Sequence, residues 1–513
     1  MYKNNYCGAL ANYLYRSGVF RSTKNSLLFT FGVRYSSVFN LIYFFFMFIS
    51  FAFMFLGCIL CYNYLKLTEI SVNLVSKSTV GFFCFDAISI GLIFITLTIF
   101  PWCYLYVFNK HDRHAWAFYL FITEILVFMA FLSIDLLFFF IVFEILIFPM
   151  YKIILGWGSQ GDLRLTAARS FVMYTVLGSI ILLFVIIYLY SVFGSTNIMI
   201  LRNFNWYLPD FLLLIMFLAF ATKVPTFPFY HWLTLAHVEA STVGSVILAA
   251  LILKLGGYGF IRFLLPMYRE HFSFYLWRHV ALSLFIISIL FAALSALVQT
   301  DIKRIVAYSS IEHINLSIIG LALCSTTSVA GAYMIILAHG WVAAGLFFAV
   351  GWVYDFRHQR DILYYRGYAI VEGWWSVFFG LLLLANIGFP LTLNFFGEIQ
   401  ILFNLFGQYT ELLLLIFIAI MANVVYTLKL GYILWGTPHN YLLNDFKYFS
   451  GTNKKFFRAF TLCVLLGVPL FLVIVSAHPE YYTKISILLD NTLSYWRVVS
   501  RATTWPWTAI RWI

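Results

Sequence analysis

Charged residues are scarce in this 513-residue chain and make up only 10% of it. Soluble globular domains carry about a quarter charged residues, so the composition excludes an ordinary soluble domain. Hydrophobic residues account for 63% of the chain, and the mean hydropathy is +0.92. Apolar runs long enough to cross a hydrocarbon core as a helix recur along nearly the whole length. The runs are continuous rather than alternating, which predicts membrane helices and not barrel strands.

The chain also lacks room for a soluble catalytic domain. Its longest polar stretches cover about residues 352–372, 437–458 and 478–513. Nowhere does it carry a Walker A sequence, a serine–histidine–aspartate arrangement or a cluster with metal-ligand spacing. Among the seven cysteines only Cys58 and Cys61 are close together, inside an apolar run. We therefore expect small buried cysteines and no metal or redox site.

The formal net charge of +12 lies mostly in connecting segments and at the two ends of the chain. Basic residues in such places anchor a membrane protein and influence its topology, so they predict contact with membrane lipid and no nucleic-acid binding. Aromatic residues make up 21% of the chain, more than the two interfacial belts require. An A+T-rich coding genome favours phenylalanine and tyrosine codons, which indicates an organelle-encoded protein.

The apolar runs predict an all-α polytopic membrane protein with about thirteen spans. The expected spans cover approximately residues 41–63, 82–107, 116–131, 133–155, 167–193, 209–229, 242–263, 278–297, 303–323, 329–351, 374–405, 412–435 and 460–477.

Two expected spans contain helix breakers, Pro225 with Pro228 in one and Gly388 with Pro390 in the other. A proline removes a backbone donor and clashes with the preceding turn. Within a membrane such breaks persist only where protein or internal water covers the freed backbone groups. The two breaks lie about 165 residues apart, which predicts two repeated halves that each contain a broken helix. Broken helices in matching positions indicate a transport site.

Ionisable residues inside the expected spans are the strongest functional candidates, because each costs about 2.5–3.5 kcal/mol at a helix centre on insertion scales. These residues are Glu144, Lys223, Lys254, His313, His339 and Glu398. Glu124, Asp135 and Glu312 are weaker candidates, since each is expected near an interface. Taken singly, a buried lysine or glutamate is also compatible with a structural ion pair, and a histidine with a core residue. Their spread over six spans, with two next to helix breaks, favours a proton relay.

Three glycines follow Lys254 closely, at positions 256, 257 and 259. Small residues in a membrane helix let a neighbouring backbone approach. We therefore expect another helix to pack tightly beside Lys254.

The run KVPTFPFYHWLTLAHVEASTVGSVILAALILKLGGYGFIRF, which begins at Lys223, resembles the signature of the antiporter-like subunits of respiratory complex I. Supporting matches are DLLFFFIVFEILIFPMY, QTDIKRIVAYSSIEHINLSIIG, LAHGWVAAGLFF and LNFFGEIQILF, in the family's order. The resemblance covers about residues 80–475, and the HVEA and LKLGGYG forms are typical of the subunit 4 type.

This resemblance implies a fourteen-helix fold with two inverted five-helix repeats, and proton translocation coupled to quinone reduction elsewhere in the complex. It places the chain in the mitochondrial inner membrane, as a multi-pass protein. It implies no cofactor in this chain, with FMN, iron–sulfur clusters and ubiquinone held by other parts of the complex. The implied partners are the subunit 5-type and subunit 2-type antiporter-like chains, accessory subunits and membrane lipid.

The resemblance also assigns roles to the candidate residues. Glu144 matches the acid that pairs with the broken-helix lysine, and Lys223 matches that lysine. Lys254 matches the central lysine. The remaining three match the two histidines of the hydrophilic axis and the exit-side acid, in the order His313, His339 and Glu398.

The sequence departs from the family pattern in the same region. Tyr230 stands where the family has a histidine, with His231 one position later, and Thr234 and Ser241 stand where prolines are usual. Residues 1–80 do not match and are expected to form a divergent segment with one clear transmembrane helix. We expect residues 81–477 to form the antiporter-like core and residues 478–513 a C-terminal extension.

Two alternatives remain open at this point. One is a subunit of a multi-subunit cation/proton antiporter, whose members share the lysine–glutamate pattern. The other is a structural membrane scaffold whose buried charges only hold helices together. Copurifying flavin and iron–sulfur subunits would exclude the first, and loss of assembly with normal pumping would favour the second.

Overall fold

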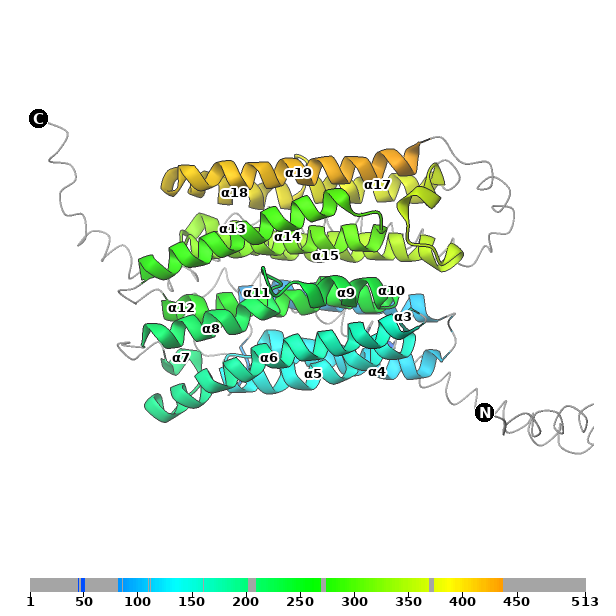
Figure 1. Ribbon diagram of the computed structural model, residues 1–513. Helices are drawn as coiled ribbons and strands as arrows, with labels where there is room; N and C mark the ends of the chain where they lie inside the picture. The colour runs from blue at the N-terminus through cyan, green and yellow to red at the C-terminus, as the bar shows by residue number, and fades with distance from the viewer. Residues whose placement is uncertain are drawn as a thin grey trace, which may run out of the picture.

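The computed structural model describes residues 82–436 with short gaps, together with residue 45 and residues 48–50. Within this part the chain is an all-α polytopic membrane protein. Long helices run side by side and stack in layers (Figure 1). The expected spans at 41–63 and 460–477 lie almost entirely outside the described residues.

The helices before the middle of the chain are mostly long. They are α3 (Ala87–Val107), α4 (Arg113–Leu132), α5 (Leu136–Trp157), α6 (Asp162–Phe193), α7 (Ile198–Leu201), α8 (Asp210–Lys223) and α9 (His231–Glu239). A continuous helical segment follows, composed of α10 (Thr242–Ile247), η1 (Leu248–Ile252), α11 (Leu253–Gly259), η2 (Phe260–Leu264) and α12 (Leu265–Tyr268). The later helices are α13 (Phe274–Val298), α14 (Ile302–Ala322), α15 (Thr326–Arg357), η3 (Ile362–Tyr365), α17 (Gly373–Ile387), α18 (Leu393–Gln408) and α19 (Thr410–Trp435).

Membrane spans occur where the sequence predicts them. Among the described residues, 9 helices are long and apolar enough to cross a membrane, and α8 and α17 are shorter apolar helices. Each shorter helix ends at one of the predicted breaks, and a second helix continues beyond it. The expected span 209–229 is too short, because a second helix, α9, follows the prolines and ends at Glu239.

Two sets of five spans succeed one another along the chain. The first half comprises α4, α5, α6, the broken helix α8–α9 and the segment α10–α12. The second half comprises α13, α14, α15, the broken helix α17–α18 and α19. The broken helix is the fourth span in both. Because five is odd, the second half starts from the opposite membrane side, so the two halves are inverted relative to one another.

The segment from Thr242 to Met267 is the core of the structure and differs from a regular helix. It contains two π-helical turns, η1 and η2, where the apolar pattern predicts an uninterrupted α-helix. Residues 242–264 of this segment and residues 328–353 of α15 are all buried, whereas α6 and α19 carry many exposed side chains. Turns of π-helix inside α-helices are rare and frequently lie at functional sites. The most irregular helix is therefore also a central one.

A buried ion pair fixes this segment to α3. Both terminal guanidinium nitrogens of Arg262, in η2, donate to the Asp86 carboxylate, at 2.5 and 2.7 Å. Asp86 also caps the N-terminus of α3 by accepting from the Ser89 backbone. Burial acts to raise the pKa of the Asp86 carboxyl, but the Arg262 charge and the hydrogen bonds from Arg262 and Ser89 together outweigh it and hold that pKa below its usual value.

Further polar contacts join the two halves at the other end of the bundle. The Arg360 guanidinium donates to both carboxylate oxygens of Glu239, at 2.8 and 3.2 Å. The Lys303 ammonium, at the start of α14, donates to the Ala240 carbonyl at 3.0 Å. The end of α9 is thereby held by the second half.

Candidate functional site

Lys223 is the last residue of α8, immediately before the first helix break. Its side chain is 3% exposed, and its ammonium nitrogen lies 3.6 Å from the centre of the Phe143 ring of α5. Within the described part of the chain this nitrogen has no hydrogen-bond partner. An aromatic face stabilises a cation, so Phe143 supplies the closest favourable contact.

Glu144 follows Phe143 on α5 and is half-buried. It lines a groove between α5 and α6 together with Tyr151 and Arg169. The carboxylate is an electrostatic neighbour of Lys223, but the two side chains are not hydrogen-bonded to one another. The acid and the lysine therefore influence each other through space rather than through a closed ion pair.

The first break is held by side chains of the second half. The Phe227 backbone amide donates to the Ser288 hydroxyl of α13 at 2.8 Å. The Asn315 amide of α14 donates to the Pro225 carbonyl at 3.2 Å. The backbone groups that Pro225 and Pro228 remove from the helical ladder are thus partly satisfied across the interface between the halves, as a break in a membrane requires.

Lys254 is fully buried in α11, at 0% exposure. Its ammonium nitrogen donates to the Ala249 carbonyl of the π-helical turn η1 at 2.5 Å. The prediction of close packing beside Lys254 is confirmed, because a Cβ on Gly256 would lie 3.2 Å from the Val224 backbone nitrogen and 3.3 Å from the Lys223 carbonyl carbon. The absence of a side chain at Gly256 lets the helix of Lys254 press against the break that follows Lys223.

Two buried histidines lie on the second-half side of Lys254. His339 of α15 and His313 of α14 have ring centres 5.2 Å apart. Both interact electrostatically with Lys254. The ring nitrogens of His339 have no hydrogen-bond partner within the described residues, which leaves them open to internal water.

His237 is a further buried histidine that the sequence analysis did not single out. It lies in α9, at 0% exposure, with its ring stacked on Phe347 at 4.7 Å between centres. It interacts electrostatically with Lys254 and with His339. The sequence signal for it was its place in the HVEA motif, about two turns into the helix that follows the break.

Glu398 of α18 completes the set beyond the second break. One of its carboxylate oxygens lies 3.5 Å from the Nδ1 atom of His313. The carboxylate also lies directly against Gly388, which has a φ of +76° and no side chain to displace it. The break thus forms a backbone cradle around the Glu398 side chain.

The weaker acidic candidates have different surroundings. Glu124 is buried and accepts a hydrogen bond from Ser50 at 3.0 Å. Asp135 caps α5 through the Leu137 amide at 3.1 Å. Glu312, expected near an interface, is instead 3% exposed inside the second half.

The departures from the family pattern are accommodated by packing. Tyr230 packs on Phe291 at 4.7 Å between ring centres, and His231 is exposed at the start of α9. The Thr234 hydroxyl donates to the His231 carbonyl at 3.0 Å. Ser241 caps α10 by accepting from an amide in the first turn.

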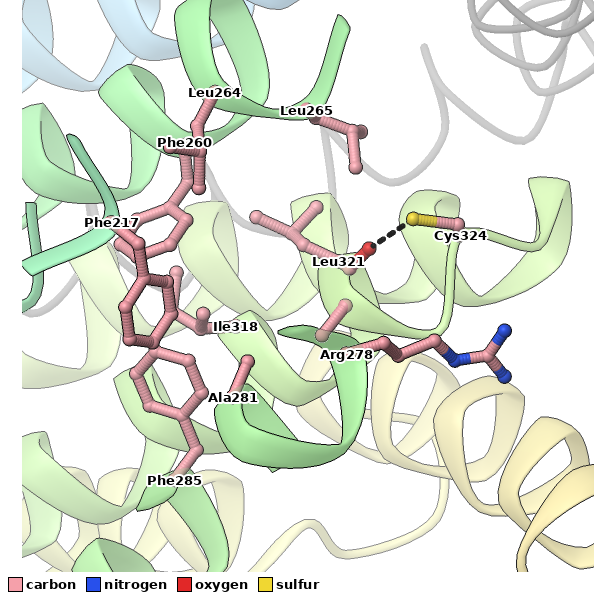
Figure 2. Close-up of a pocket in the computed structure, with 11 residues that line it drawn as sticks. Phe217, Phe260, Leu264, Leu265, Arg278, Ala281, Phe285, Ile318, Leu321 and Cys324 are labelled. Carbon is pink, nitrogen blue, oxygen red and sulfur yellow. Dashed lines mark hydrogen bonds between the residues drawn. The ribbon is translucent and has the colours of Figure 1, made fainter. Parts of the chain in front are cut away.

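A separate apolar pocket lies where the halves meet, near the α12 end of the bundle (Figure 2). Phe217, Phe260 and Phe285 line one side, and the Arg278 guanidinium points away from them. The pocket contains none of the candidate residues.

The chain matches a known protein family over more than half of its length. Residues 133–422, which include all six candidates, match the family model described as NADH:quinone oxidoreductase/Mrp antiporter, TM. The chain belongs to this family. Its relatives by sequence include subunits of NADH oxidoreductases. It is 36% identical to NADH-ubiquinone oxidoreductase chain 4 of Acanthamoeba castellanii, over 74% of this chain and 76% of that one. It is 38% identical to NADH-quinone oxidoreductase subunit M of Rickettsia prowazekii, over 67% and 71%.

Solved structures share the fold. A chain of respiratory complex I from Thermus thermophilus superposes with a TM-score of 0.71 and 24% identity, covering 80% of this chain and 86% of that one. A chain of the Mrp complex from a Dietzia strain superposes with a TM-score of 0.69 and 20% identity, covering 80% and 78%. At these identities the likeness establishes the shared architecture.

Proposed function

We propose that this chain is a proton-translocating membrane subunit of NADH:ubiquinone oxidoreductase, of the subunit 4 type. Family membership and the chain 4 and subunit M relatives support this function. The chain itself carries out no redox chemistry. Quinone reduction elsewhere in the complex drives proton movement through the buried groups of this subunit.

The proton path runs from the first half to the second. Glu144 modulates the charge of Lys223, and Lys223 exchanges protons with Lys254 through internal water. Lys254 exchanges protons with His339 and His313, and Glu398 passes the proton on towards release. His237 joins the path beside Lys254, because its ring interacts electrostatically with that lysine.

The single observation that carries this proposal is the position of Lys254. It is fully buried between the Lys223 break and the two histidines of the second half. No carboxylate among the described residues pairs with it, so a charge there is costly and its proton responds to changes in charge nearby. A structural lysine would instead be expected to pair with an acid.

Its partners and setting follow from the proposed function. We propose contacts with the subunit 5-type and subunit 2-type chains, with accessory subunits and with membrane lipid. FMN, iron–sulfur clusters and ubiquinone belong to other parts of the complex. The aromatic-rich composition supports placement in the mitochondrial inner membrane.

The test is purification of the tagged chain from membranes in a mild detergent. The proposal predicts that flavin absorbance, iron–sulfur paramagnetic signals and NADH:ubiquinone reductase activity copurify with it. Copurification of other antiporter chains without flavin would support a cation/proton antiporter subunit instead. The shared fold of the Mrp complex makes that the second candidate.

A further inference from the structure

A group of polar side chains surrounds the second helix break, and Glu312 is the member with no role in the proposed path. The Asn394 amide donates to the Ala385 carbonyl at 2.9 Å, and the Asn423 amide donates to the Asn386 carbonyl at 3.2 Å. These bonds satisfy carbonyls at the end of α17, as a break in a membrane helix requires. We call Glu312, Asn386, Asn394, Glu398, Asn423 and Tyr426 the second-break cluster.

Glu312 is buried within this cluster rather than near a membrane interface. It is 3% exposed, and one carboxylate oxygen accepts a hydrogen bond from the Tyr426 hydroxyl of α19 at 3.0 Å. It precedes His313 on α14 and interacts electrostatically with Glu398. Neither Tyr426 nor Glu398 carries a positive charge.

Two buried carboxylates, Glu312 and Glu398, therefore interact electrostatically near the second break. Isolated carboxylate charges are expensive in a low-dielectric interior, and like charges repel strongly there. The basic neighbour of this pair is His313, whose Nδ1 lies 3.5 Å from Glu398. While that imidazole is neutral, the pair holds at least one proton, as two carboxylates that share a site do elsewhere. A singly protonated pair can both donate a proton and accept one.

The second-break cluster offers binding positions for internal water. The side-chain oxygens of Asn394 and Asn423 are buried, and neither has a hydrogen-bond partner among the residues that the structure describes. Buried amide oxygens are normally satisfied by protein or by ordered water. Both amides belong to the same cluster as Glu312 and Glu398.

We infer that Glu312 is a second proton-carrying carboxylate of the exit site and shares a proton with Glu398. The proton passes from His313 to Glu398, whose oxygen lies 3.5 Å from Nδ1. It then moves through water to the carboxylate oxygen of Glu312 that Tyr426 does not engage. The pair alternates between one proton and two as it receives and releases. This inference rests on the proposed function and adds a residue to its release step.

The test compares E312Q, E398Q and the double variant in the assembled complex. The measured quantity is the number of protons translocated per NADH oxidised. If the two acids act as a unit, E312Q lowers this ratio to the level of E398Q, and the double variant falls no further. The matched control is E411Q, which removes an exposed glutamate at the start of α19 and leaves the ratio unchanged. A wild-type ratio in assembled E312Q would overturn the inference.

Infrared difference spectra give an independent readout of the shared proton. The carbonyl band of a protonated carboxylic acid should change in E312Q and in E398Q, because each substitution removes one of the two acids that share the proton. It should shift in Y426F, which keeps both acids but removes the donor to Glu312. Should E312Q fail to assemble, Y426F decides: a shifted band and a lowered ratio support the inference, and a wild-type band contradicts it.

The K254M variant separates this inference from the proposed function. A lowered proton ratio in K254M with a wild-type ratio in E312Q would refute the role of Glu312 alone. An unchanged ratio in K254M, together with a changed carboxylic acid band in E312Q, would refute the proposed path while leaving the carboxylate pair in place.

Discussion

The Lys254 ammonium nitrogen donates a hydrogen bond to the Ala249 carbonyl, 2.5 Å away and five residues earlier in the same segment. An ammonium group offers three donors, and this bond uses one of them. The acceptor lies in a π-helical turn, and the electrostatic neighbours of Lys254 include His237, His313 and His339 rather than an acid. The central lysine is thus anchored to its own helix, and its proton is free to respond to the histidines around it.

The contact between Gly388 and Glu398 predicts the effect of a single methyl group. G388A places a Cβ against the Glu398 carboxylate at a φ of +76°, a left-handed conformation that costs an L-residue about 1–2 kcal/mol. We expect fewer protons per NADH oxidised. The control G407A adds a methyl group at a glycine of α18 with open space around its Cβ position, and should behave as wild type. Equal proton ratios in the two variants would contradict the role of the cradle.

The hydrogen bonds to the first break predict a local loss of order. N315A and S288A each remove a side chain that holds a break backbone group, at a cost of about 1–3 kcal/mol for a buried group left unsatisfied. Amide hydrogen exchange over residues 224–230 should accelerate in both. S283A, at an exposed serine of α13, is the matched control. Unchanged exchange in N315A and S288A would show that the second half does not hold the break.

The contact between the Phe143 ring and Lys223 predicts that the ring stabilises the protonated form of the lysine. F143L removes an aromatic face 3.6 Å from the ammonium, where a desolvated cation–π contact is worth about 2 kcal/mol. The protonated form of Lys223 loses that stabilisation, so the proton ratio should fall at normal assembly. F184L, at an exposed ring of α6, serves as the control. A wild-type ratio in F143L would assign Phe143 to packing alone.

The ion pair between Arg262 and Asp86 predicts a stability effect rather than a pumping effect. D86N leaves a buried guanidinium without its carboxylate, which costs about 3–5 kcal/mol. The complex should melt at a lower temperature and assemble in smaller amounts. D112N, at the exposed N-cap of α4, makes no side-chain capping bond and should leave the melting temperature unchanged. Wild-type stability in D86N would contradict a stabilising role for this ion pair.

The lowered pKa of Asp86 fixes the pH range of this contribution. The Asp86 carboxyl is ionised in the folded chain at a pH where the unfolded carboxyl is already protonated. Its stabilising contribution is therefore complete above the unfolded pKa and is lost as the pH falls through the lower folded pKa. D86N should abolish this part of the acid dependence of melting.

The helix breaks and the spans could be predicted from sequence because their signals are local. Pro225 and Pro228 interrupt an apolar run, and so does Gly388 with Pro390. A proline lacks the amide that a helix needs, whatever packs around it. The close approach at Gly256 was also predictable, since a missing side chain is visible in the sequence itself.

Other features depend on contacts that no local pattern records. The residues of the two π-helical turns before and after Lys254 are mostly apolar, like those of the neighbouring α-helical turns, so the sequence does not distinguish them. The burial of Glu312 depends on the packing of α14 near Tyr426 of α19. The His237 ring stacks on Phe347, which is distant in the sequence, so its burial is not visible in the local pattern. The resemblance implies that Glu144 pairs with Lys223. In the structure the two side chains interact electrostatically but form no hydrogen bond, a detail that depends on how α5 packs against α8.

The central claim is that Lys254 carries protons between the two halves. The most direct test is the number of protons translocated per NADH oxidised by the assembled complex with K254M. K429M is the matched control, because Lys429 is an exposed lysine of α19 that donates to the Leu297 carbonyl at 2.8 Å. The ratio should fall in K254M and equal that of wild type in K429M. An unchanged ratio in fully assembled K254M would contradict the claim.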